Sequence, residues 1–121
     1  MKHIEDAAQA ALMQWAHMRK YKDGKLSQWI THVPNGGKRD VREAARLKAQ
    51  GAMAGFPDLF LFIARGQWHG LMIEMKSPKG RLSPAQTQVL PRIEGEGYRV
   101  EVCYSVQAAI DVISDYLEVA Q

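Results

Sequence analysis

Two carboxylates and an amine are closely spaced in the most hydrophobic part of this chain. Asp58 stands at the start of one hydrophobic run, and Glu74 and Lys76 stand at the end of the next. Side chains of residues i and i+2 leave the same face of a β-strand, so Glu74 and Lys76 project together while Met75 points the other way. Converging carboxylates bind a divalent cation, and an adjacent amine stabilises charge on a phosphate. This pattern predicts metal-assisted hydrolysis of a phosphodiester bond.

The segment between the two carboxylates has the pattern of a β-hairpin. A strand at 59–64, a turn at 65–67 and a return strand at 69–76 fit the alternation of apolar runs and turn residues. Pro57 fixes its own φ and favours extended backbone before it, so Asp58 enters the first strand in a defined orientation. We therefore expect Asp58 and Glu74 to be neighbours in space.

Length and composition narrow the class of protein. The 121 residues, 46% of them hydrophobic, fit one globular domain spanning 1–121. The apolar runs are shorter than the ~20 residues that cross a bilayer, so we expect a soluble intracellular protein without a membrane partner. The single Cys103 excludes an internal disulfide and a multi-cysteine zinc site. Carboxylate oxygens remain as ligands for a hard cation, and Mg²⁺ or Mn²⁺ fits best.

The basic residues bracket the acidic segment. The net charge of +3 and the pI near 9.1 are compatible with a nucleic-acid partner without establishing one. The residues that could hold a phosphate backbone are Lys38, Arg39, Arg42, Arg46 and Lys48 before the hairpin, and Lys79 and Arg81 after it. For Lys38 and Arg39 the alternative is an ordinary solvated loop.

Periodicity and capping signals predict the remaining elements. Ser83, followed by proline and by Gln86 three residues on, predicts a helix start, which Pro91 then kinks or ends. Ser105 is expected to cap the last helix. The expected order is a helix at 4–21, a strand at 27–33, a helix at 41–50 capped by Asp40, strands at 59–64 and 69–76, a helix from 84, a strand at 98–104 and a helix from 106. This α-β-α-β-β-α-β-α order predicts an α/β fold with a mixed sheet flanked by helices.

Three motifs together carry a family resemblance. They are Pro34-Asn35-Gly36-Gly37-Lys38-Arg39, Gly55-Phe56-Pro57-Asp58-Leu59 and Glu74-Met75-Lys76-Ser77-Pro78-Lys79-Gly80-Arg81-Leu82-Ser83-Pro84-Ala85-Gln86. In this order they resemble the VRR-NUC nucleases of the PD-(D/E)XK superfamily, including small stand-alone phage-type members. The resemblance implies a restriction-endonuclease-like core and a metal-dependent DNA endonuclease associated with repair. It also implies branched substrates such as four-way junctions, a homodimer and, for a phage protein, the cytoplasm of a bacterial host.

The resemblance also implies roles for single residues. Asp58 and Glu74 would bind the metal, with the carbonyl oxygen of Met75 as a further ligand, and Lys76 would act beside the scissile phosphate. Glu5 matches the family's amino-terminal glutamate, which reaches the metal directly or through water. Its alternative is a helix-start residue favoured by the helix dipole. Gln86 matches a glutamine that reaches water or phosphate, with Gln9 as a weaker case, although a capping interaction with Ser83 explains Gln86 equally well.

Two other functions remain open on the sequence alone. One is a DNA-binding or assembly module of the same fold that does not cut. Its weakness is that unneutralised clustered carboxylates would repel DNA. The other is a nuclease that acts on RNA or on free DNA ends. The four histidines lack metal-ligand spacing and are interpreted as structural or surface residues.

Overall fold

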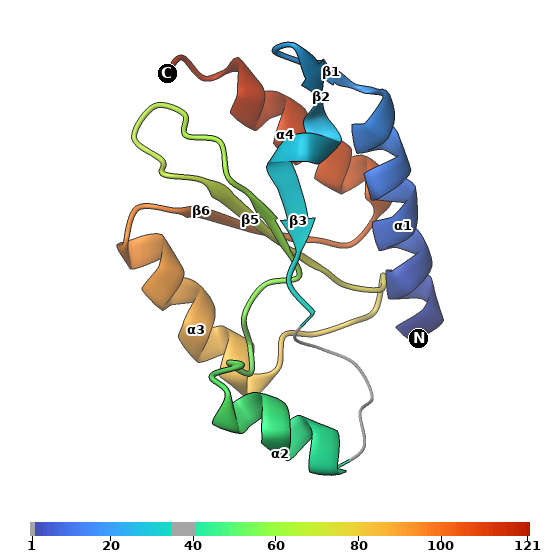
Figure 1. Cartoon of the computed structure of the whole chain (residues 1–121), viewed down its shortest axis with the longest axis vertical. Coiled ribbons are helices and arrows are strands. Elements are labelled where there is room, and N and C mark those ends of the chain that lie inside the picture. Colours follow the sequence, from blue (N-terminus) through green and yellow to red (C-terminus); the bar gives the residue numbers. More distant parts are fainter. Residues whose placement is uncertain (1, 35–40) are drawn as a thin grey trace.

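The computed structural model describes residues 2–34 and 41–121, and a four-stranded mixed sheet lies at its centre (Figure 1). The strand order is β3–β4–β5–β6, with β3 at Ile30–His32, β4 at Leu59–Leu61, β5 at Leu71–Met75 and β6 at Arg99–Cys103. The β3–β4 and β4–β5 pairs are antiparallel, whereas β5 and β6 are parallel. The expected mixed sheet and the expected hairpin are both confirmed.

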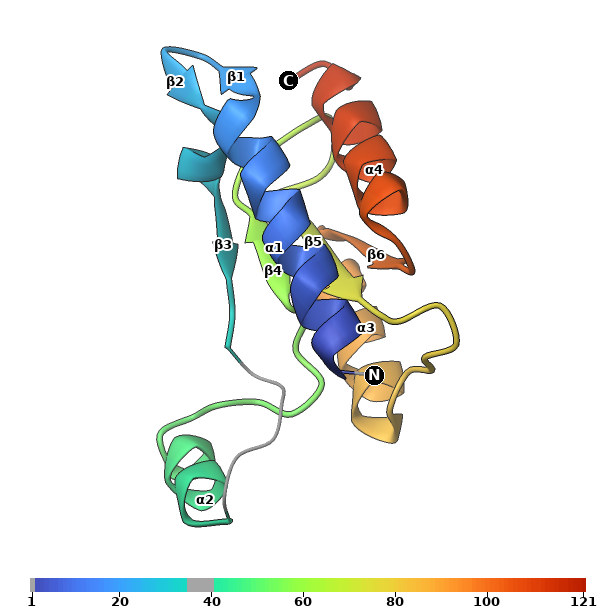
Figure 2. The same cartoon turned by 90° about the vertical axis from the view of Figure 1, so that its right-hand side faces the viewer.

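Helices cover the two faces of the sheet unequally. Helix α1 (Lys2–Met18) and helix α4 (Val106–Glu118) pack on the first face, and α3 (Pro84–Gly95) packs on the second face against β6 (Figure 2). Helix α2 (Val41–Ala49) has no buried residue and stands apart from these layers, at the lower end of Figure 1.

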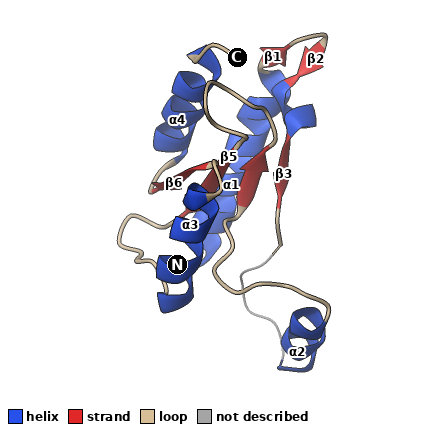
Figure 3. Cartoon of the chain, turned by 90° about the vertical axis from the view of Figure 1, so that its left-hand side faces the viewer, coloured by secondary structure: helices blue, strands red, loops and turns tan. Residues whose placement is uncertain are grey.

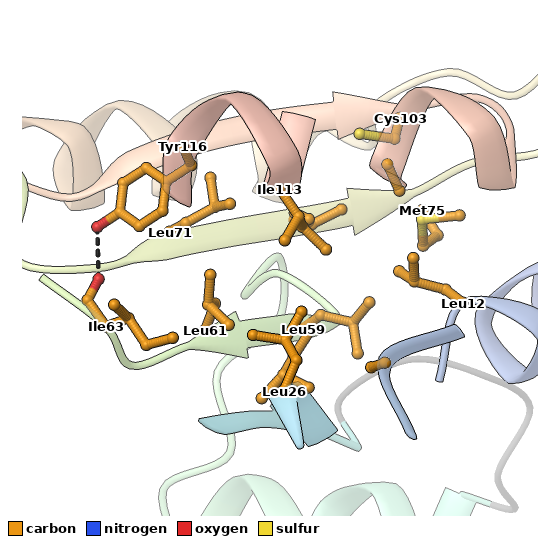
Figure 4. Packing of buried hydrophobic residues seen from close by; sticks show 14 residues of the cluster. Leu12, Leu26, Leu59, Leu61, Ile63, Leu71, Met75, Cys103, Ile113 and Tyr116 are labelled. Carbon is orange, nitrogen blue, oxygen red and sulfur yellow. Dashed lines mark hydrogen bonds between the residues drawn. The ribbon is translucent and has the colours of Figure 1, made fainter. Parts of the chain in front are cut away.

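The hydrophobic core lies between the sheet and the pair α1 and α4. Alternate residues of β4 and β5 project into it, as the period of two requires (Figure 4). Tyr116 is fully buried there, and its hydroxyl donates a hydrogen bond of 2.6 Å to the carbonyl oxygen of Ile63. The core residues that Figure 4 labels are Leu12, Leu26, Leu59, Leu61, Ile63, Leu71, Met75, Cys103, Ile113 and Tyr116.

Both predicted serine caps are present. Ser83 Oγ accepts from the backbone N–H of Gln86 at 3.1 Å, and Gln86 Oε1 accepts from the backbone N–H of Ser83 at 2.8 Å, which completes the capping box. Ser105 Oγ accepts from Ala108 N–H at 3.0 Å at the start of α4. The predicted cap at Asp40 lies outside the described residues.

Three local predictions need correction. Helix α1 ends at Met18 rather than near residue 21, and a short hairpin follows it, formed by β1 (Lys20–Tyr21) and β2 (Gly24–Lys25). The predicted strand at 27–33 begins instead as a 3₁₀ helix at Leu26–Trp29, where Leu26 is buried. Pro91 does not end α3, which continues to Gly95. Burial of Val89 and Leu90 in the turn before Pro91 compensates for the backbone hydrogen bond that proline removes.

Within the described ranges, no helix combines the length and the apolar character that a membrane span requires.

Candidate active site

A cavity of about 370 Å³ opens at the edge of the sheet where β5 ends. It is lined by the amino-terminal half of α1, by the start of α3 and by Asp58, which immediately precedes β4. The residues predicted for the site that line it are Glu5, Gln9, Asp58, Glu74, Met75, Lys76 and Gln86. Segments that are far apart in the sequence therefore meet at one concave surface.

A tight backbone contact positions Asp58. Gly55 has φ +90°, and a Cβ added there would lie 2.7 Å from the carbonyl carbon of Ala85 and 2.9 Å from the backbone nitrogen of Gln86. Only glycine combines this φ with so close an approach to the start of α3. The buried Pro57 follows, and Asp58 Oδ2 then accepts a 2.8 Å hydrogen bond from the backbone N–H of Met75. Asp58 is thus held against the last residue of β5.

Glu74 and Lys76 form a buried pair beside Asp58 in the same cavity. Lys76 Nζ lies 3.5 Å from Glu74 Oε2, and the two side chains are only 13% and 5% exposed. The backbone N–H of Lys76 donates to the carbonyl of Cys103 at 2.9 Å, so strand β6 orients the amine. Glu74 Oε1 is buried, and among the described residues it has no hydrogen-bond partner. A buried carboxylate oxygen of this kind is rare in proteins and is suited to bind a cation or water.

Burial raises the pKa of both carboxylates, and the charge of Asp58 adds to the rise at Glu74. Burial, and then the charge of Asp58, raise the pKa of Glu74 from 4.5 to about 7, although Lys76 and Gln86 oppose the rise. Burial also raises the pKa of Asp58, against the hydrogen bond from Met75 and the charge of His32. A cation between the two carboxylates would remove most of this destabilisation.

Gln86 caps helix α3 and also lines the cavity. Its Oε1 accepts from Ser83 N–H in the capping box, while its side chain, only 7% exposed, also lines the cavity. Because the cap uses the oxygen, the amide nitrogen is the group that remains for the cavity, and Gln86 accordingly lowers the pKa of Glu74.

His32 and Asp6 also line the cavity, and the residue pattern did not indicate either. His32 is exposed, as predicted, yet its Nδ1 lies 2.9 Å from the carbonyl oxygen of Asp58. Its position follows from the pairing of His32 with Leu59 in the β3–β4 ladder. No local sequence signal reveals that long-range register, since β3 is short and its partner lies beyond α2.

The predicted phosphate-binding residues lie outside the cavity. Arg42 and Arg46 are exposed on α2, where Arg46 approaches Glu43 at 3.8 Å in a surface ion pair. Lys79 and Arg81 are exposed in the loop between β5 and α3. Lys38 and Arg39 fall outside the described residues. Arg42, Arg46, Lys79 and Arg81 are therefore not among the residues that line the cavity.

The donor set suits a cation that keeps part of its water shell. Within the described part of the chain, no group of three or more His, Cys, Asp or Glu residues is arranged to hold a metal. Two carboxylates and one carbonyl fit Mg²⁺, which is commonly bound through one or two carboxylates with water and phosphate completing its octahedron. The orphaned Glu74 Oε1 supports the same fit.

The model of the VRR-NUC domain matches residues 4–107, which include every residue of the cavity. The chain belongs to the VRR-NUC family. A solved structure described as a VRR_NUC domain protein is similar to it, with a TM-score of 0.88 and 35% sequence identity over 98% of this chain and 91% of the other. No curated protein matches the chain. The VRR-NUC domain implies a nuclease-type function, with DNA as the substrate.

Proposed function

We propose that the chain is a metal-dependent DNA endonuclease that hydrolyses phosphodiester bonds. The observation that carries this proposal is the pair Asp58 and Glu74 in one cavity. Among the described residues Glu74 Oε1 is buried without a hydrogen-bond partner, and the Lys76 amine lies 3.5 Å from Glu74 Oε2. A module that only binds DNA gains nothing from two partly buried carboxylates, since their charges repel phosphate.

Asp58 and Glu74, with the Met75 carbonyl oxygen, would hold Mg²⁺ or Mn²⁺. Such an ion acidifies water, and it neutralises charge on the phosphate oxygens. The protein contributes the geometry: Asp58 is fixed by Met75 N–H, and Glu74 is fixed by burial in the sheet. Neither side chain needs to reorganise when the substrate arrives.

Lys76 and Gln86 would act on the substrate side of the cavity. The Lys76 amine is held close to Glu74 and stabilises the negative charge that develops on the phosphate. The amide of Gln86 donates a hydrogen bond to water or phosphate. Glu5 lines the cavity from α1 without joining the carboxylate pair in a ligand cluster, so we assign it a contact through water.

The basic residues outside the cavity would hold the DNA backbone. Arg42, Arg46, Lys79 and Arg81 are exposed, and with Lys38 and Arg39 they would contact phosphates without reading bases.

The finer proposal is that a homodimer acts on branched DNA such as four-way junctions. In the described part of the chain one cavity holds the carboxylate pair, and a small domain offers little surface with which to recognise a junction. A two-fold dimer would present two such cavities to symmetric arms. The resemblance to junction-resolving VRR-NUC proteins supports this assignment.

Parallel cleavage assays with Mg²⁺ test the proposal. The substrates are a four-way junction, a matched linear duplex, a circular duplex and an RNA hairpin. We expect cleavage of the junction in preference to the linear duplex, and cutting of the circle, which has no ends. Cleavage of linear but not circular DNA would show an exonuclease, and preference for the hairpin would show an enzyme that acts on RNA. If no substrate is cut, the chain is a DNA-binding or assembly module without nuclease activity. Light scattering at micromolar concentration measures the subunit number.

A further inference from the structure

The second face of the sheet carries aromatic side chains in line with the candidate active site. By the alternation along a strand, Asp58, Phe60 and Phe62 follow one another on one face. Phe60 is paired with Met72, which precedes Glu74 by two residues on the same face of β5. This face therefore runs from the carboxylates to the two phenylalanines.

Part of this face has no described helix over it. Helix α3 lies over the β6 side, whereas in Figure 3, which views the molecule from this side, no described helix stands in front of β3. Phe62 is 44% exposed and Phe60 is half-buried, and neither belongs to the hydrophobic core. A contiguous apolar patch on an open sheet face marks an interaction site, whereas a single exposed apolar side chain does not.

Four rings form a continuous aromatic series that includes Phe60 and Phe62, and Trp29 at its end also packs against the hydrophobic core. The ring centroids of Trp29 and Phe62 are 6.0 Å apart, those of Phe62 and Phe60 are 6.0 Å apart, and those of Phe60 and Tyr98 are 6.1 Å apart. Gly70 leaves room for the last contact, because a Cβ there would lie 2.9 Å from the Phe60 ring and 3.4 Å from the Tyr98 ring. The series crosses the sheet from β6 to β3.

A cation stands at one end of the series. Lys22 Nζ lies 4.9 Å from the centroid of the Trp29 ring and 5.7 Å from that of Tyr21. Lys22 has φ +50°, a conformation that few residues other than glycine adopt, in the turn between β1 and β2. The β1–β2 hairpin thus holds an exposed amine over the terminal ring.

The other end of the series reaches a hollow that shares one residue with the active-site cavity. This apolar hollow of about 390 Å³ lies beside Tyr98, with Met72, Arg92 and Glu96 among its lining residues. Phe56 lines both this hollow and the active-site cavity. A strand that leaves the carboxylates along this face would pass Phe56 and then reach the rings.

We propose that this aromatic series binds unpaired bases of the DNA strand whose phosphate is held at the active site. The proposal rests on the proposed nuclease function and names the part of the substrate that this surface recognises. Every base offers a π-face, and rows of aromatic rings beside cations are the usual platform for single-stranded nucleic acid. Strands with unpaired bases occur at branch points, so such a platform favours branched DNA over a plain duplex.

A second copy of the chain is the competing occupant, because aromatic residues are also enriched at protein interfaces. Two observations favour the DNA strand. The Lys22 amine lies over the Trp29 ring, where its positive charge suits a phosphate. Phe56 lines both the hollow beside Tyr98 and the cavity proposed for phosphodiester hydrolysis. A protein partner requires neither feature.

Binding of two single strands in EDTA tests the proposal without cleavage. One strand is oligothymidine, and the other is an abasic strand of the same length and charge; affinity is measured by fluorescence anisotropy. We expect the wild type to bind the thymidine strand at least about tenfold more tightly, the scale of one stacked base. Phe62→Ala should lose most of this difference, Phe62→Tyr should keep it, and Val119→Ala, at a 40% exposed position on the other layer, should not change it.

Two results would overturn the inference. One is equal affinity of the wild type for both strands. The other is an unchanged preference in Phe62→Ala, and an accompanying shift from dimer to monomer in light scattering would assign the face to a second copy. Cleavage with Mg²⁺ is measured separately, so that the two proposals can fail independently. Cleavage without base-dependent binding would overturn only the proposal that the aromatic series binds bases. Base-dependent binding without cleavage would overturn only the proposed nuclease function.

Discussion

Glu74→Gln is expected to stabilise the fold at pH 8 while it abolishes cleavage. In the folded wild type, burial and the neighbouring Asp58 raise the pKa of Glu74 from 4.5 to about 7. The unfolded chain lacks both influences, so its pKa remains near 4.5. The difference of about 2.5 corresponds to about 3 kcal/mol of lost stability when Glu74 is ionised, at ~1.4 kcal/mol for each pH unit.

The pH window follows from the direction of this shift. Below pH 4.5 the carboxyl is protonated in both states and does not affect the free energy of unfolding. Between 4.5 and about 7 the unfolded chain loses the proton first, so stability falls as the pH rises. Above about 7 the loss is complete and constant. Glutamine has no charge to bury, so the advantage of Glu74→Gln grows through this window.

Lys76 offsets part of the gain. Its side chain is 13% exposed and pairs with Glu74 at 3.5 Å, so the variant leaves a largely buried amine with a weaker partner. We expect a net stabilisation of about 1–2 kcal/mol at pH 8, equivalent to a rise of about 3–10 °C in Tm for a domain of this size.

Thermal and urea unfolding in EDTA at pH 5 and pH 8 measure this difference. Glu94→Gln, an exposed carboxylate on α3, is the matched control and should leave the dependence on pH unchanged. A Glu74→Gln variant that is no more stable than wild type at pH 8, or whose advantage is the same at both pH values, would refute the buried-charge reasoning.

Three further predictions concern the rest of the site. Lys76→Ala should lose cleavage but keep the rise in Tm that Mg²⁺ gives the wild type, since the amine is not a metal ligand; loss of that rise would make Lys76 part of the metal site. Arg42→Ala and Arg46→Ala should each reduce the slope of log affinity against log salt by about one, and an unchanged slope for both would return them to a solvated helix face. Gly55→Ala should lower the free energy of unfolding by at least ~2 kcal/mol, because the φ is unfavourable and the added Cβ would lie 2.7 Å from the Ala85 backbone. Urea unfolding measures it, and a loss below ~0.5 kcal/mol would contradict the close-approach argument.

Local signals predicted the parts of this structure that depend on neighbours in sequence. The capping box of Ser83 and Gln86 and the cap at Ser105 each involve residues three apart, and the structure contains all of these contacts. The hairpin that brings Asp58 near Glu74 is also local, since one turn connects its strands. These contacts need no knowledge of the rest of the chain.

The features that the sequence pattern did not predict depend on contacts between residues far apart in the chain. The register that brings His32 beside Asp58 pairs β3 with β4 across the intervening α2 segment. The 3₁₀ turn at Leu26–Trp29 forms where Leu26 enters the core, against the β-propensity of that stretch. The capping box likewise did not reveal that Gln86 faces the cavity, because that depends on where α3 docks.

The dependence of cleavage on metal and on Asp58 tests the central claim most directly. Asp58→Asn keeps an oxygen that can accept from Met75 N–H, so it removes charge with little change of shape. We predict that the wild type cuts DNA with Mg²⁺ or Mn²⁺ and does not cut it in excess EDTA. Asp58→Asn should fold with the same Tm or a higher one and cut more than about 100-fold more slowly, which corresponds to an activation barrier ~2.7 kcal/mol higher. Full wild-type activity in EDTA, or an Asp58→Asn rate within about tenfold of wild type, would contradict a metal held by the two carboxylates.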